Sequence, residues 1–116
     1  MSFFKKLFSR KQYTLENFPP IREEIKKGNY VFVNLYSESC LVCKRTKPMI
    51  EEVHQQYPNV NILEILIDEF PEKQLRKYGI VFTPTLALFG KKGEALHRSV
   101  GLIQKEKLVE LFSLSK

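Results

Sequence analysis

The order of apolar and polar positions divides the chain into alternating strand-like and helix-like segments. Two runs that are apolar on both faces predict a central strand and a second buried strand. Two later runs are separated by the turn Gly90–Gly93, and this spacing predicts a hairpin. The predicted strands, with a short extended piece at the start, are Gln12–Leu15, Tyr30–Tyr36, Val60–Ile67, Thr85–Phe89 and Glu94–Val100.

Helical spacing of apolar residues occupies the stretches between these strands. Prolines suit the first turn of a helix and glycine its end, so Pro19 and Gly28 bound the first one. The longest helix is expected to turn Leu41, Ile50 and Val53 toward the interior. The predicted helices are Pro19–Lys27, Cys40–Gln56, Pro71–Lys77 and Lys105–Leu114.

Strands separated by helices indicate parallel pairing, and the late hairpin adds antiparallel pairing. The expected fold is therefore α/β, with a mixed central sheet of four to five strands flanked by helices on both faces. A hydrophobic fraction of 43% is enough for one core. We expect a single domain over residues 12–116, preceded by a basic, Phe-rich segment at residues 1–11.

The net charge of +6 favours acidic partners, but no recognition motif accompanies it, so nucleic-acid binding is not expected. Residues 1–11 contain no apolar stretch long enough for a signal peptide or membrane span, which favours the cytoplasm. We expect this segment to be frayed or docked on the core. The alternative is a weak contact of residues 3–11 with an anionic membrane surface, because phenylalanines and lysines alternate there.

Cys40 and Cys43 are the only cysteines, and they open the longest predicted helix. In a reducing compartment such a pair is either redox-active or half of a zinc site. Zinc needs about four ligands. His54 lies about 16 Å beyond Cys43 on one helix, and the position of His97 relative to the pair is open. We expect no metal. The helix N-terminus favours Cys40 as the exposed nucleophile and Cys43 as the shielded, resolving thiol.

Three motifs together resemble the thioredoxin family: a strand followed by Cys40-Leu-Val-Cys43-Lys44, Pro48 inside the following helix, and Thr83-Pro84-Thr85. The similarity spans roughly Tyr13 to Phe112. Further residues at spacings that the family uses are Asp68, Tyr78-Gly79-Ile80, Phe89, Gly93-Glu94 and Gly101.

The resemblance implies a thioredoxin-like fold and a thiol–disulfide oxidoreductase that reduces protein disulfides through a Cys40/Cys43 cycle. It implies a cis bond before Pro84 beside the cysteine pair, with the main chain of Thr83 binding substrate. No bound cofactor is implied. The expected partners are protein disulfides and an electron donor, either a thioredoxin-reductase-like protein or a small thiol, and the protein is expected to be a monomer.

The chain also departs from the family. Ser39 replaces the usual Trp, and Leu41-Val42 replaces Gly-Pro between the cysteines, where apolar side chains would contact an apolar substrate. Asn34 stands at the position of a buried Asp that exchanges protons, and Asn has no titratable proton. Asn34 would then hold a relaying water, Glu64 would substitute, or the protein would be a slow, specialised reductant. The simplest alternative is that Asn34 only makes a hydrogen bond in the core.

These departures keep two other functions open. The first is a non-enzymatic or weakly active interaction module that retains the fold. The second is an oxidase or isomerase at a membrane surface, suggested by the basic, Phe-rich start of the chain.

Overall fold

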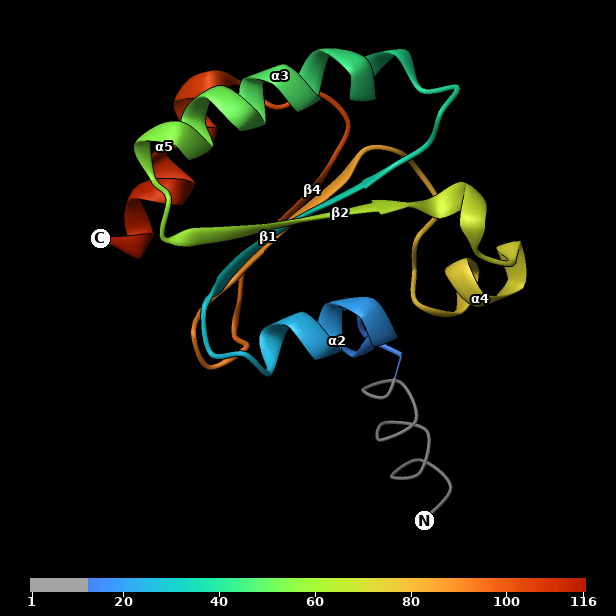
Figure 1. Ribbon diagram of the computed structural model, residues 1–116. Coiled ribbons are helices and arrows are strands. Elements are labelled where there is room, and N and C mark those ends of the chain that lie inside the picture. Colours follow the sequence, from blue (N-terminus) through green and yellow to red (C-terminus); the bar gives the residue numbers. More distant parts are fainter. Residues whose placement is uncertain (1–12) are drawn as a thin grey trace.

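The computed structural model describes residues 13–116, in which a mixed sheet lies between two layers of helices (Figure 1). The predicted segment at residues 1–11 lies outside the described residues. The elements in chain order are η1 (Leu15–Asn17), α2 (Pro19–Ile25), β1 (Tyr30–Tyr36), α3 (Leu41–Gln56), β2 (Val60–Leu66), η2 (Ile67–Glu69), α4 (Glu72–Lys77), β3 (Thr85–Phe89), β4 (Ala95–Val100), α5 (Lys105–Phe112) and η3 (Ser113–Ser115), where η denotes a 3-10 helix.

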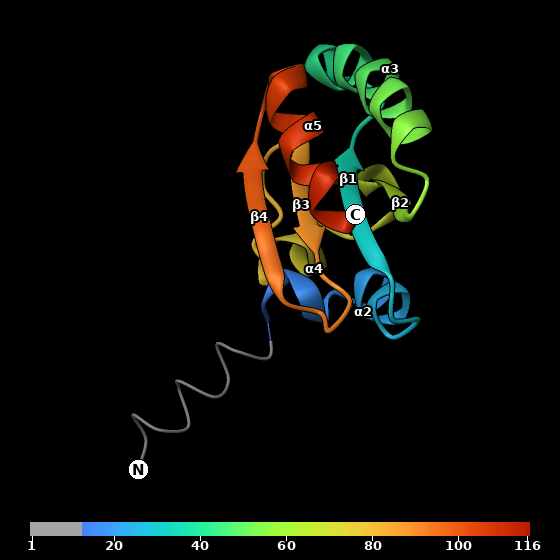
Figure 2. The same cartoon turned by 90° about the vertical axis from the view of Figure 1, so that its left-hand side faces the viewer.

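The sheet has four strands in the order β2-β1-β3-β4. β1 pairs in parallel with β2 and antiparallel with β3, and β3 pairs antiparallel with β4. Figures 1 and 2 show α3 and α5 over one face and α2 and α4 over the other. The predicted α/β fold with helices on both faces is confirmed, with a four-stranded sheet.

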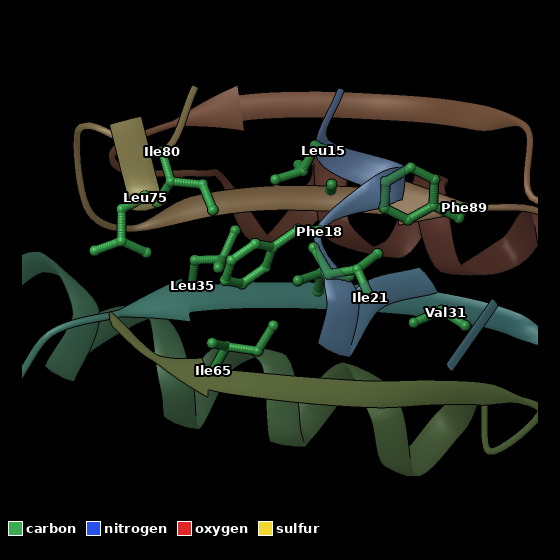
Figure 3. Close-up of a cluster of buried hydrophobic side chains, with 11 residues drawn as sticks. Leu15, Phe18, Ile21, Val31, Leu35, Ile65, Leu75, Ile80 and Phe89 are labelled. Atoms are coloured by element: carbon green, nitrogen blue, oxygen red, sulfur yellow. The ribbon is translucent and has the colours of Figure 1, made fainter. Parts of the chain in front are cut away.

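Side chains of the central strand β1 alternate between two cores, as the two-residue period of a strand requires. Val31, Val33 and Leu35 point toward α2 and α4, and Phe32 points toward α3 and α5. Figure 3 shows the first core, where Phe18 from the start of α2 lies among side chains of the sheet. A strand buried on both faces is apolar at most positions, which is why Tyr30–Tyr36 was recognisable in the sequence despite the buried Asn34.

Three expectations about the elements were wrong. Within the described part of Gln12–Leu15 there is no strand, since Tyr13 lies in a turn and Leu15 begins η1. The segment predicted as a buried strand at Val60–Ile67 ends at Leu66 and is partly exposed, because among the described residues only β1 pairs with it. Leu41 does not point inward and is 74% exposed.

Among residues 13–116, none of the helices combines the length and the apolar character that crossing a membrane requires. The carboxyl end of β1 and the segment that leads into β3 lie at the same end of the sheet, away from the β3–β4 turn (Figure 1). The cysteine pair follows the end of β1, and the Thr83–Pro84 loop precedes β3, so both belong to this end of the sheet.

Candidate active site

The first turn of α3 is built around the sulfur of Cys40. Cys40 is the N-cap residue, with extended backbone angles of −85° and 110°, and its amide donates to the carbonyl of Ser37 at 3.3 Å. Its Sγ accepts the backbone N–H of Cys43 at 3.1 Å. Helix N-termini leave amides unpaired and carry partial positive charge, so negative charge on this sulfur is stabilised where it sits.

Cys40 and Cys43 form a disulfide, with their Cα atoms 5.2 Å apart. The two sulfurs differ in access: Cys40 is half-buried, whereas Cys43 is only 4% exposed. This difference agrees with the expected division between an approachable first thiol and a shielded second one. A disulfide across three positions at a helix start can open and close without moving the sheet below it.

The loop before β3 lies against this turn. The Thr83–Pro84 peptide bond is cis, as the resemblance led us to expect. The hydroxyl oxygens of Ser37 and Thr83 are 3.3 Å apart, and the amide of Gly101 donates to the carbonyl of Pro84 at 2.9 Å. Hydrogen bonds therefore link three segments far apart in sequence, those of Ser37, of Thr83–Pro84 and of Gly101, and Ser37 in turn accepts the amide of Cys40.

The main chain of Thr83 is available for pairing. Within residues 13–116 neither its N–H nor its C=O has a hydrogen-bond partner, and its side chain is half-buried. The neighbouring hydroxyl of Thr85 donates to the carbonyl of Phe82 at 2.6 Å, which holds the loop in shape from inside. An extended peptide laid along this loop would meet one free donor and one free acceptor.

Apolar side chains project from each of the three segments. Leu41 is 74% exposed, Phe82 66% and Leu102 59%. Exposed apolar side chains that gather around one feature mark contact surfaces more often than scattered ones do. Leu41, predicted from sequence to contact substrate, thus lies on the surface, whereas Val42 is half-buried and Pro84 is buried.

Asn34, on β1, borders the same cavity as Cys43. It is 1% exposed, and its Oδ1 has no hydrogen-bond partner among the described residues. A buried acceptor left unpaired costs about 1–3 kcal/mol, which a bound water would offset. The side chain borders a cavity of about 250 Å³ that Cys43 also lines. The complete lining is Asn34, Tyr36, Ser37, Glu38, Cys43, Lys44 and Lys47.

Glu64, one of the expected substitutes for an acid at position 34, does not reach this cavity. It pairs with Asn34 in the register of β1 and β2, but it lies exposed on the edge strand and is absent from the cavity lining. Lys47 does line the cavity. Three basic residues follow Cys43 closely in the sequence: Lys44, Arg45 and Lys47. In the structure Lys44 and Lys47 border the cavity, and Arg45 does not.

The histidines do not join the cysteine pair. No group of three or more metal-ligating side chains occurs among residues 13–116, so the zinc alternative finds no ligand set there. His97 lies on β4 with Nε2 2.8 Å from the Ser99 hydroxyl. Partial burial lowers the pKa of His97 from its ordinary value, Lys107 lowers it further, and Glu110 opposes both.

Comparison with known proteins gives one consistent result. The family model described as Thioredoxin matches residues 10–113. The chain is 37% identical to a thioredoxin of Chlamydia trachomatis over 98 residues, which is 84% of this chain and 90% of that protein. It is 41% identical to a thioredoxin of Rickettsia bellii over 90 residues, covering 76% and 84% of the two chains.

A solved structure agrees with the sequence comparisons. A mutant thioredoxin from Halobacterium salinarum superposes with a TM-score of 0.68 at 26% identity, covering 83% of each chain. The arrangement of strands and helices around the cysteine pair is therefore the thioredoxin fold, as the motifs in the sequence led us to expect.

Proposed function

Because the chain belongs to the thioredoxin family and is a protein-disulfide oxidoreductase, we propose how its residues divide the work. Cys40 is the attacking nucleophile and Cys43 the resolving thiol. The observation that carries this assignment is the position of Cys40, whose sulfur caps α3 and which is the more accessible of the two residues. Its amide donates to Ser37, whose hydroxyl contacts Thr83 of the loop before β3.

The cycle balances as two successive thiol–disulfide exchanges. The Cys40 thiolate attacks one sulfur of a substrate disulfide, and the other substrate sulfur leaves as a thiolate and takes up a proton. Cys43 then loses its proton and attacks the Cys40 sulfur, which breaks the mixed disulfide and releases the second substrate thiol. The substrate gains two electrons, and the protein is left with the Cys40–Cys43 disulfide present in this structure.

Substrate recognition falls to the surface around the pair. The free main-chain groups of Thr83 pair with an extended substrate segment beside Pro84. Leu41 and Val42 contact apolar side chains of the substrate, and the exposure of Leu41 supports its part in this. Asn34 holds a water that carries the proton of Cys43, and two observations support this: its buried Oδ1 has no hydrogen-bond partner among the described residues, and the residue borders a cavity that Cys43 also lines.

We place the protein in the reducing cytoplasm as a monomer without a bound cofactor. A reductase of the thioredoxin-reductase type or a small thiol returns the pair to the dithiol. Electrons then flow from that donor through the Cys40–Cys43 pair to the substrate disulfide, and the similarity to relatives named thioredoxin supports this direction. The alternative of a weak contact between residues 3–11 and an anionic membrane surface is tested by sedimentation with anionic liposomes, comparing the full chain with one that starts at Lys11.

Reduction of insulin disulfides tests the assignment of the two sulfurs. Cys40→Ser abolishes turnover, whereas Cys43→Ser accumulates a mixed disulfide with substrate that a small thiol dissolves. Full activity of the Cys40→Ser variant overturns the assignment. Equilibration of the Cys40–Cys43 pair with glutathione tests the direction: a pair that stays oxidised against a large excess of reduced glutathione supports a reductase, and one that is readily reduced contradicts it.

A further inference from the structure

Lys47 occupies a special position relative to the resolving sulfur. Cys43 and Lys47 are four residues apart in α3, so they share one face of the helix. Side chains on a helix tilt toward its N-terminus, which directs the stem of Lys47 back over the turn that holds Cys43. Both line the same cavity with Asn34. Arg45, between them in sequence, does not.

The ammonium group of Lys47 is not committed elsewhere. Among residues 13–116 it has no carboxylate within salt-bridge distance, whereas lysines on other faces, such as Lys26 and Lys105, are paired. Lys47 is itself exposed, whereas Cys43 is nearly buried, so its charge acts on the Cys43 sulfur through the cavity that both residues line. A positive charge there lowers the energy of the sulfur most when the sulfur is negative. Solvent and salt screen an exposed charge, so the expected effect is small.

The other charged and titratable groups near this cavity partly oppose one another. Lys44 and Glu38 line it with opposite charge, and Tyr36 contributes a neutral phenol. From the neighbouring elements, Asp68 accepts the amide of Glu38 at 3.1 Å, and Glu64 lies exposed beside Asn34 in the β1–β2 register. Asn34 itself carries no charge. All of these charged groups are exposed, and so is Lys47. Lys47 differs from them in lying one helical turn after Cys43 on the same face of α3.

We propose that Lys47 acts through this cavity as a positioning residue that stabilises the thiolate of Cys43, in place of the buried ionisable group that position 34 lacks. The proposal rests on the assignment of Cys43 as the resolving thiol. In that step the Cys43 proton passes to cavity water and bulk solvent, the new bond joins Cys43 to Cys40, and the substrate sulfur departs as a thiolate that is then protonated. Lys47 keeps its own proton throughout.

Titration of a single thiol tests the proposal without any substrate. In the full chain carrying Cys40→Ser, Cys43 is the only cysteine, and the absorbance of its thiolate in the far ultraviolet reports its pKa. Lys47→Gln raises this pKa by about half a unit, which corresponds to about a threefold smaller thiolate fraction near neutral pH. Lys47→Arg keeps the charge and leaves the pKa within experimental error of the parent.

Arg45→Gln is the matched control, since it removes the same charge from the same helix at an exposed position outside the cavity. It leaves the pKa of Cys43 unchanged, and thermal unfolding shows that all three variants fold. The proposal is overturned if Lys47→Gln titrates like the parent, or if Arg45→Gln shifts the pKa as much as Lys47→Gln does. The titration tests the role of Lys47 and uses no substrate, whereas insulin reduction tests the roles of Cys40 and Cys43. Failure of one proposal can therefore be distinguished from failure of the other.

Discussion

The hydroxyl of Ser37, just after β1, lies 3.3 Å from the hydroxyl of Thr83, just before the cis proline. These residues are 46 positions apart in the sequence. One belongs to the segment that carries the disulfide, and the other to the loop proposed to hold the substrate main chain. The hydrogen bond therefore links the segment that carries the disulfide to this loop.

Ser37→Ala should loosen that spacing. We expect the KM for a protein disulfide to rise a few-fold with little change for a small aromatic disulfide, and stability to fall by about 1 kcal/mol or less. A double-mutant cycle with Thr83→Val isolates the contact, because Ser37→Ala then has nothing left to remove. Ser113→Ala is a suitable control, since its hydroxyl donates to the carbonyl of Glu110 at 2.7 Å on α5. Strictly additive effects of Ser37→Ala and Thr83→Val would contradict this role.

Asn34→Asp should add a new pH dependence to the stability of the protein. Burial raises the pKa of a carboxyl at this position, so the folded state holds the proton more tightly than the unfolded state does. Stability then falls as pH rises from the unfolded-state pKa through the raised one. Melting temperature against pH measures this, and the pH profile of insulin reduction shifts with it. Identical profiles for parent and variant would show that position 34 does not exchange protons with the site.

Substituting alanine for a buried and for an exposed phenylalanine should have different effects, the first on stability and the second on substrate binding. Phe18 is fully buried and packs on the rings of Phe70 and Tyr78, so Phe18→Ala costs about 3–5 kcal/mol. Phe82 is 66% exposed beside the Thr83 loop, so Phe82→Ala changes stability by about 0.5 kcal/mol or less and raises the KM for protein substrates. Urea unfolding and insulin reduction read the two effects. A large loss of stability in Phe82→Ala would contradict its placement on the surface.

His97 should make stability depend on pH in the opposite direction. Burial first, and Lys107 second, lower its pKa below the ordinary value of 6.5, with Glu110 acting against them. The unfolded state then binds more protons than the folded state, so this contribution is fully present above 6.5 and is lost as pH falls through the lowered pKa. His97→Gln should flatten the fall in melting temperature between about pH 7 and about pH 5. An equally steep fall in the variant would assign the effect to other groups.

The sequence predicted the bounds of a strand best where both faces of the strand are buried. β1 and β3 have the predicted bounds, because a strand buried on both faces is apolar at nearly every position, with Asn34 and Thr85 as the buried polar exceptions. It was least informative at the margins of the sheet. Leu15 begins η1 and packs in the core. In a stretch of only four residues, one buried apolar position does not distinguish a strand from a 3-10 helix. β2 is apolar but lies at an edge, so its exposure could not be read from composition.

Some features of the site could be predicted from the sequence, and others depend on how the chain folds. A local motif sufficed to find Cys40 and Cys43, and the resemblance to a family sufficed to expect the cis bond before Pro84. The cavity under Asn34 and the contact between Ser37 and Thr83 depend on segments that only the folded sheet brings together. Periodicity places a residue on a face of its own element but does not say what the neighbouring element brings to that face.

The disulfide at the start of α3 spans only three positions. A cross-link that closes so short a loop removes little freedom from the unfolded chain, about 2 kcal/mol by the loop-entropy estimate. Small domains have about 5–15 kcal/mol of stability, so most of it does not depend on this bond. The protein can therefore exchange electrons without unfolding, and its melting temperature should be higher in the oxidised form, by about 4–8 °C for each kcal/mol that the disulfide contributes. The sulfur pair carries electrons and has only a minor part in holding the chain together.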